Sequence, residues 1–262
     1  MAVNIKNAHA KNLHIGPGII TDGLVSWWNA ASIRSYPRTG SIWYNLIKKN
    51  QNDGSLINMS ETNFSEEAGG VLVFDGSDEY VSIPNDDSLN FGSNSFSVSL
   101  WISIESTLTW SGSGAYIIGK RGLGSLGGFS GWQILARSTS SGWLFANTGV
   151  DDGTVSEIVT NSSLSLQFNK WYMITLTYDT VQLLLYIDNQ VVAANNIAGI
   201  GSISNTIPVE ILGTSYYNHV NYGSPIEVTQ GTISNIALYN KSLTGDEVRH
   251  NWTARQSMYN ND

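Results

Sequence analysis

The residues best suited to bind a ligand lie in one loop, between positions 214 and 223. Its phenol rings, amide and imidazole come from Tyr216, Tyr217, Asn218, His219 and Tyr222. An aromatic ring can cover the apolar face of a sugar while fixed polar groups bond its hydroxyls. We therefore predict a glycan-binding surface here, to which Trp110 and Trp143 would add. The alternative is that these aromatic side chains pack between subunits.

Acidic side chains on predicted turns form a second candidate site. They are Asp75, Asp78, Asp151, Asp152 and Asp179. Carboxylate oxygens on turns are the hard donors that Ca²⁺ prefers, so calcium is the ion expected if any is bound. The alternative is that these aspartates are only solvated turn residues. The chain has no cysteine, which excludes disulfides and thiolate metal sites.

The sequence contains no convincing catalytic set. Residues 122–127 match the G-x-G-x-x-G pattern, but a dinucleotide site needs a helix after it, and residues 128–136 have the pattern of a strand. A surface loop is the better interpretation. No Ser-His-Asp order and no histidine-rich metal spacing occurs. We predict a protein that is not an enzyme and has no catalytic residues.

Composition indicates strands joined by turns. Charged residues make up 13% of the chain, and glycine occurs 26 times. The net charge of −8 argues against a nucleic-acid partner. The basic pairs Lys48–Lys49 and Lys120–Arg121 are expected to be solvated turn residues. No apolar run approaches the roughly 18 residues of a membrane span, so we predict no membrane insertion.

Hydrophobic alternation locates several strands. Residues 96–104 place Phe96, Val98 and Leu100 on one face with Ile102 and Ile104, which is typical of a half-buried strand. Further strands are predicted at 171–178 and 182–188, the second leading into a tight hairpin in which Asn189 suits a positive φ. Two more, at 71–74 and 80–83, flank a turn. Two sheets packed face to face would bury so many strands.

The end of the domain has the signature of a helix. Thr244 can cap the helix, and Glu247 can reach back to the cap N–H. Leu243 and Val248 are placed to form a hydrophobic staple across the same turn. We predict an N-terminal arm or linker at residues 1–20, one domain at 21–256 and a tail at 257–262.

An ordered set of motifs carries a family resemblance. The motifs lie at 22–28, 70–81, 95–101, 169–188 and 231–248. They resemble the concanavalin A-like lectin/glucanase superfamily in its laminin-G-like branch. The resemblance implies an all-β, two-sheet antiparallel jelly-roll sandwich with a short C-terminal helix, in which residues 70–81 form a hairpin.

That fold hosts lectins, adhesion modules and hydrolases, so it does not fix the function. Hydrolases of the superfamily carry a run of alternating carboxylates such as E-x-D-x-x-E on one strand. Here Glu105 stands alone after its strand, and Asp86–Asp87 lies in a turn. A glycoside hydrolase is therefore the remote alternative.

The opening segment, residues 12–24, resembles those of structural proteins from tailed phages. This implies a structural or decoration protein of the virion, on its head or tail, and the absence of a signal-like apolar segment fits assembly in the host cytoplasm. The expected partners are other virion proteins and further copies of the chain, held through the N-terminal arm. The alternative is an adhesion module that binds host surface polysaccharide.

Overall fold

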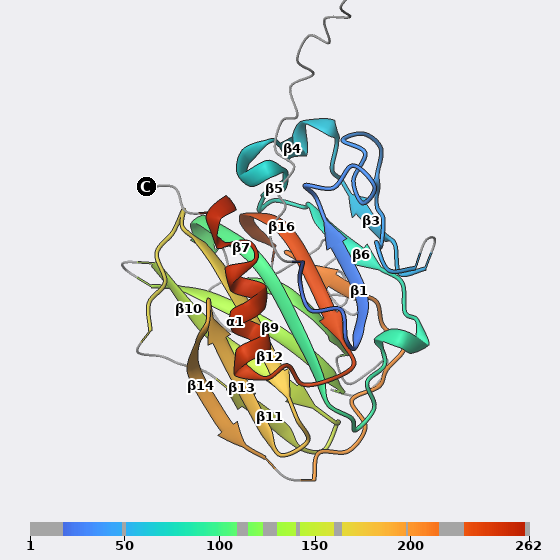
Figure 1. The fold of residues 1–262 in the computed structure, drawn as a ribbon, viewed down its shortest axis with the longest axis vertical. Coiled ribbons are helices and arrows are strands. Elements are labelled where there is room, and N and C mark those ends of the chain that lie inside the picture. The colour runs from blue at the N-terminus through green and yellow to red at the C-terminus, as the bar shows by residue number, and fades with distance from the viewer. Residues whose placement is uncertain are drawn as a thin grey trace, which may run out of the picture.

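The computed structural model describes residues 18–48, 51–108, 115–122, 130–139, 142–159, 164–197, 199–214 and 228–259. They form two antiparallel sheets packed face to face, with one short helix near the C-terminus (Figure 1). The predicted all-β sandwich is confirmed. None of the described helices is both long and apolar enough to cross a membrane.

We call the first sheet sheet A. Its strand order is β14–β13–β12–β7–β16–β5–β4, and β1 also pairs with β16. The strands are β14 (Gln190–Asn196), β13 (Gln182–Ile187), β12 (Trp171–Tyr178), β7 (Phe96–Leu108), β16 (Thr229–Tyr239), β5 (Val71–Asp75), β4 (Phe64–Ser65) and β1 (Leu24–Asn29).

The second sheet, sheet B, has the order β11–β10–β9–β8–β15–β6–β3–β2. Its strands are β11 (Ser156–Val159), β10 (Gly142–Asp151), β9 (Gly131–Thr139), β8 (Ala115–Arg121), β15 (Val209–Ile211), β6 (Tyr80–Ile83), β3 (Gly54–Ile57) and β2 (Ile42–Trp43). Short 3₁₀ turns complete the described chain at Glu61–Asn63, Glu67–Gly69, Asp87–Leu89 and Gln256–Met258.

The main core lies between the sheets. The five alternating apolar side chains predicted on β7 are all fully buried there, and β12 and β13 fall where the sequence predicted strands. Ile118 and Ile134 of sheet B belong to the same cluster. Burial of apolar surface between two sheets therefore follows from the period-2 pattern of the sequence.

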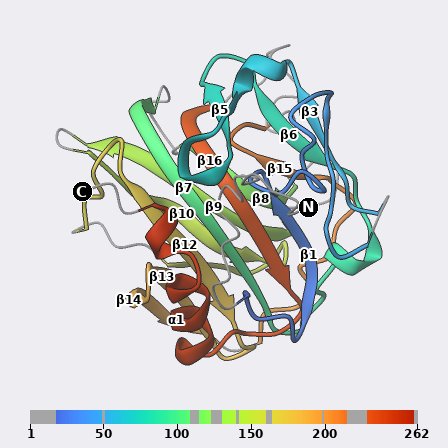
Figure 2. The ribbon, with the colours of Figure 1, turned by 45° about the horizontal axis from the view of Figure 1, so that its top comes forward.

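Helix α1 (Gly245–Thr253) covers the outer face of sheet A (Figures 1 and 2). Trp101 points outward from β7 into this second layer, where its ring stacks on Tyr259 at a centroid distance of 4.1 Å. Ile19 joins the same cluster. Residues assigned to the arm and the tail thus pack on the sandwich, and the boundaries at 20 and 256 stay predictions.

Two local predictions are wrong. The segment at 70–81 is not a hairpin, because β5 pairs within sheet A and β6 pairs within sheet B, so the turn crosses from one sheet to the other. In the β13–β14 turn, the residue with a positive φ is Asp188, at 55°. Its carboxylate accepts the N–H of Met173, at 2.9 Å, which ties the turn to β12.

The helix start is confirmed. Thr244 Oγ1 accepts the N–H of Glu247, and Glu247 Oε2 accepts the N–H of Thr244 at 2.9 Å. Leu243 and Val248 are both buried beneath the helix. The cap thereby satisfies two N–H groups that the helix leaves without intrahelical partners.

Removing the cap should destabilise the protein. Thr244→Ala is expected to lower the free energy of unfolding by about 1 kcal/mol, measured by urea denaturation. Thr253→Ala is the matched control, because Thr253 lies at the other end of the helix and its hydroxyl only donates back to the Arg249 carbonyl. An equal loss in both variants would contradict a capping role for Thr244.

Candidate functional site

The outer face of sheet B carries two rows of outward-facing residues on β8, β9, β10 and β11. Pairing between neighbouring strands aligns Gly119, Gln133, Gly149 and Ile158 in one row. It aligns Arg121, Gly131, Asp151 and Ser156 in the next row. Glycine thus alternates with larger side chains across this part of the sheet.

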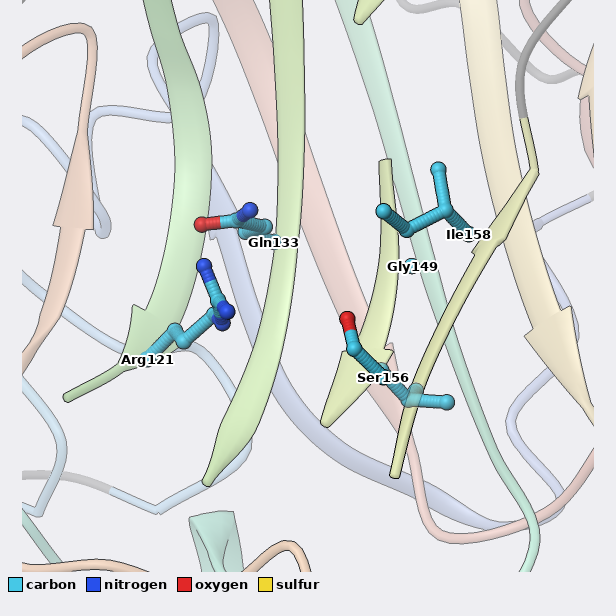
Figure 3. A pocket seen from close by; sticks show the side chains of 6 residues that line it. Arg121, Gln133, Gly149, Ser156 and Ile158 are labelled. Carbon is cyan, nitrogen blue, oxygen red and sulfur yellow. The ribbon is translucent and has the colours of Figure 1, made fainter. Parts of the chain in front are cut away.

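Residues of these two rows line a hollow of about 210 Å³. Its lining residues are Arg121, Gln133, Gly149, Val150, Ser156 and Ile158. The Arg121 guanidinium and the Gln133 amide stand on one side, with Ser156 and Ile158 on the other (Figure 3). Ile158 is 41% exposed and supplies an apolar surface beside these polar groups.

Arg121, which lines the hollow, forms an ion pair with Asp151. Arg121 Nη2 donates to Asp151 Oδ2 at 2.6 Å, and the two side chains are only 15% and 7% exposed. Asp151 Oδ1 accepts the N–H of Gly153 at 2.8 Å. Because solvent is largely excluded and both carboxylate oxygens are engaged, the pair is held in one geometry.

Glycines make room for this arrangement. Gly131 lies in the register between Arg121 and Asp151, so no side chain separates the two charged groups across β9. Its φ of 137° is a region that glycine occupies readily. Gly149 similarly leaves space between Gln133 and Ile158.

A network of buried hydrogen bonds holds the strand that carries Arg121. The preceding residue, Lys120, points inward, is 2% exposed, and donates to the backbone carbonyl and the side-chain oxygen of Asn205 at 2.8 and 2.7 Å. Asn205 in turn donates to the carbonyls of Lys120 and Ser130. Burial lowers the pKa of the Lys120 ammonium to about 8. The expectation that Lys120–Arg121 is a solvated pair is therefore wrong.

The prediction that Trp143 takes part in a glycan surface is also wrong. Its side chain is fully buried, with edge contacts to Phe145 and Tyr172, and its indole N–H donates to the Gln167 carbonyl at 3.3 Å. It faces the core from β10, so no sugar can stack on it.

The other aromatic candidates lie outside the described residues. These are Trp110, Tyr216, Tyr217, Asn218, His219 and Tyr222. The described residues that flank the loop, Thr214 and Val228, lie close to β15, and Thr214 donates to Glu210 at 2.6 Å. The glycan role of this loop stays a prediction.

The five aspartates do not form a calcium site in the described parts of the chain. Asp75 and Asp78 are exposed on the β5–β6 turn. Asp179 accepts the N–H groups of Val181 and Gln182. Asp151 forms an ion pair with Arg121. No group of three or more acidic or histidine side chains converges among the described residues.

Backbone N–H groups hold the carboxylate of Asp152. It accepts the N–H of Val155 at 2.7 Å and that of Gly201 at 2.6 Å. The hydrogen bond from Val155, followed by those from Gly201 and Thr154, keeps the pKa of Asp152 well below its usual range. Burial raises the pKa of Tyr178, and the nearby carboxylates of Asp179 and Asp152 raise it further. The carboxylate of Asp152 anchors a turn.

The sequence signal for the hollow was weak. Asp151 was predicted only as a metal ligand, and Arg121 only as a solvated turn residue. Arg121, Gln133 and Ser156 become neighbours only through the pairing of four strands, which motif spacing does not reveal. A usable signal was the placement of single polar residues beside glycine within strand-like segments, since such a glycine marks a close approach or a bulge.

The fold and the hollow define a lectin-like β-sandwich. The chain belongs to the concanavalin A-like lectin/glucanases superfamily, whose laminin-G-type profile matches residues 75–249. It is 27% identical over 184 residues to the non-toxic nonhemagglutinin type A of Clostridium botulinum (strain Kyoto / Type A2). That match covers 70% of this chain but only 14% of the clostridial protein.

Solved structures share the fold. Trypanosoma rangeli sialidase in complex with sialic acid matches with a TM-score of 0.63 and 16% identity, over 94% of this chain and 35% of that chain. The binding domain of Paraclostridial Mosquitocidal Protein 1 matches with a TM-score of 0.62 and 15% identity, over 88% and 52%. Domain 4 of the Geobacillus stearothermophilus arabinanase AbnA, in complex with arabinotriose, matches with a TM-score of 0.55 and 12% identity, over 88% and 98%.

Proposed function

We propose that the chain is a non-enzymatic carbohydrate-binding module and that the hollow on sheet B is its binding site. The observation that carries the proposal is the combination of fixed polar groups and one exposed apolar side chain around a small depression. Sugars require this combination, because they present hydroxyls at their edges and C–H groups on their faces. Arg121, Gln133 and Ser156 supply the polar groups, and Ile158 supplies the apolar one.

The size of the hollow fits a small part of a glycan. Pockets for drug-sized ligands are about 300–1,000 Å³, and this hollow is smaller. A single sugar unit at a chain end or a branch is therefore the natural occupant. The arabinotriose complex of an arabinanase domain with the same fold supports a carbohydrate ligand for this class of sandwich.

Three of the described carboxylates, those of Asp151, Glu105 and Asp86, favour a binding role over hydrolysis. Glycoside hydrolysis uses two carboxyl groups on either side of the scissile bond. Asp151 is neutralised by Arg121. Glu105 accepts hydrogen bonds from Gln230 and Thr232, and Asp86 caps the turn at Asp87–Leu89. These side chains have structural partners that occupy their oxygens.

A blocking variant tests the site. The purified protein is screened on a microbial glycan array, and the best ligand is titrated by calorimetry in calcium and in EDTA. We expect binding of equal strength in both buffers. Ser156→Trp should weaken binding at least about tenfold, which is about 1.4 kcal/mol, because the indole would enter the hollow.

Ser77→Trp is the matched control, because Ser77 is exposed on the β5–β6 turn, and β8 and β15 separate β6 from β9 in the strand order of sheet B. It should bind like the unmodified protein. Undiminished binding by Ser156→Trp would overturn the assignment of the hollow. The absence of any glycan ligand would overturn the carbohydrate-binding function.

The second candidate is a structural or decoration role on a phage virion. It is favoured by the resemblance of residues 12–24 to the openings of tailed-phage structural proteins. The two candidates are compatible, because an adhesin can be part of the particle. In this proposal the partners are other virion proteins and further copies of the chain. Mass spectrometry of purified particles would test it, and a particle without this chain would contradict it.

A further inference from the structure

The charges around the hollow determine which sugars suit it. Among the described residues that line the hollow, Arg121 carries a positive charge, and Asp151 compensates this charge at 2.6 Å. Recognition of a carboxylate or sulfate by arginine normally uses the two-pronged face of the guanidinium. Here a protein carboxylate already bonds to Nη2, so an anionic ligand would have to compete with a partner that is fixed and largely shielded from water.

The overall charge of the chain also disfavours anionic ligands. The whole chain carries a net charge of −8. The carboxylates of Asp152 and Glu157 are close to the hollow in sequence but bond elsewhere, to the Gly201 N–H and to the Asn195 side chain. An approaching anion would therefore meet a neutral ion pair on a protein of negative net charge.

The uncharged polar groups that line the hollow suit neutral hydroxyls. A sugar hydroxyl both donates and accepts, and so do the Gln133 amide and the Ser156 hydroxyl. Ile158 offers apolar contact on the side opposite Arg121 (Figure 3).

We infer that the hollow selects a neutral sugar unit and discriminates against uronate, sialate and sulfated sugars, and that the Arg121–Asp151 pair sets this preference. The inference rests on the proposed carbohydrate-binding function and names its ligand class. Asp151 acts as a specificity-determining residue, because it withholds the charge of Arg121 from the ligand.

Matched sugars provide the test. Galactose and galacturonate oligomers of equal length, and glucose and glucuronate oligomers, are titrated into the protein by calorimetry. The neutral member of a pair should bind at least about tenfold more tightly. Asp151→Asn should shift the preference at least about tenfold toward the acidic member, because the amide keeps an oxygen for the Gly153 N–H but no longer neutralises Arg121.

Asp179→Asn removes the same charge from an exposed turn and should leave the preference unchanged. The gain of acidic binding in Asp151→Asn is a readout that misfolding cannot produce. Tighter binding of the acidic sugars by the unmodified protein would overturn the inference and leave the carbohydrate-binding function standing. An unchanged preference in Asp151→Asn would overturn the role of the pair. Binding of no sugar in the panel or on the array would overturn both the inference and the function.

Discussion

Replacing Gly131 by alanine should destabilise the protein by about 3 kcal/mol or more and abolish ligand binding. A Cβ at this position would overlap the Lys120 carbonyl and lie 2.6 Å from the Cα of Arg121. Both obstacles are backbone atoms of β8, so no side-chain rotation relieves them. The positive φ of 137° adds strain for any residue with a side chain. Separation of β8 from β9 would also break the alignment of Arg121 with Asp151.

Chemical denaturation with a binding titration measures both effects. Gly153→Ala is the control, because Gly153 also has a positive φ, of 88°, but has no atom within 4 Å of an added Cβ. It should cost only about 1–2 kcal/mol, from backbone strain alone. If both variants lost the same free energy of unfolding, the close approach of β8 to β9 at Gly131 would make no contribution to stability.

Stability should rise by about 2 kcal/mol between pH 7.5 and 9.5 through Lys120 alone. Its pKa falls from 10.5 to about 8 on folding, because burial disfavours the charged ammonium. Between these two values the unfolded chain carries a proton on Lys120 that the folded protein lacks, so stability increases with pH. Well below pH 8 the Lys120 ammonium is charged in both the folded and the unfolded state. The folded state then bears the full cost of burying this charge, about 3 kcal/mol at about 1.4 kcal/mol per pKa unit.

Buried tyrosines act in the opposite direction at higher pH. Burial is the largest cause that raises the pKa values of Tyr36, Tyr178, Tyr186, Tyr239 and Tyr259. Above about pH 10 the unfolded chain loses tyrosine protons that the folded protein keeps, so stability then declines. The pH profile should therefore show a maximum between the Lys120 rise and the tyrosine fall.

Lys120→Met separates the two contributions. In this variant the rise between pH 7.5 and 9.5 should disappear, while the fall above pH 10 remains. Lys48→Met is the control, because Lys48 is exposed and should leave the rise in place. Denaturant unfolding at a series of pH values measures the profile. A rise that persists in Lys120→Met would contradict a buried ammonium at this position.

Local sequence patterns predicted the elements that depend on neighbours in the chain. Strict alternation at 96–104 identified the inner face of β7, and the Thr244–Glu247 spacing identified the start of α1. Both signals act within a few residues, where geometry follows directly from the period of a strand or a helix. The density of strand signals predicted two packed sheets, and the family resemblance implied their jelly-roll arrangement.

Features that depend on strand pairing were not predictable in this way. The turn after β5 looks like a hairpin, yet its strands belong to different sheets, because alternation records which face is buried and not which strand is the partner. Lys120 and Arg121 look like a surface pair, although one faces the core and the other the hollow. Trp143 resembles a sugar platform in the sequence, and only its register on β10 shows that it faces inward.

The most direct test of the central claim is a crystal structure of the protein with the tightest-binding neutral oligosaccharide from the array. We predict one sugar unit in the hollow, with its hydroxyls bonded to Arg121, Gln133 and Ser156 and its apolar face against Ile158. Sugar density on the loop at 214–223 with none in the hollow would contradict the account. It would place the binding function on the aromatic side chains of that loop.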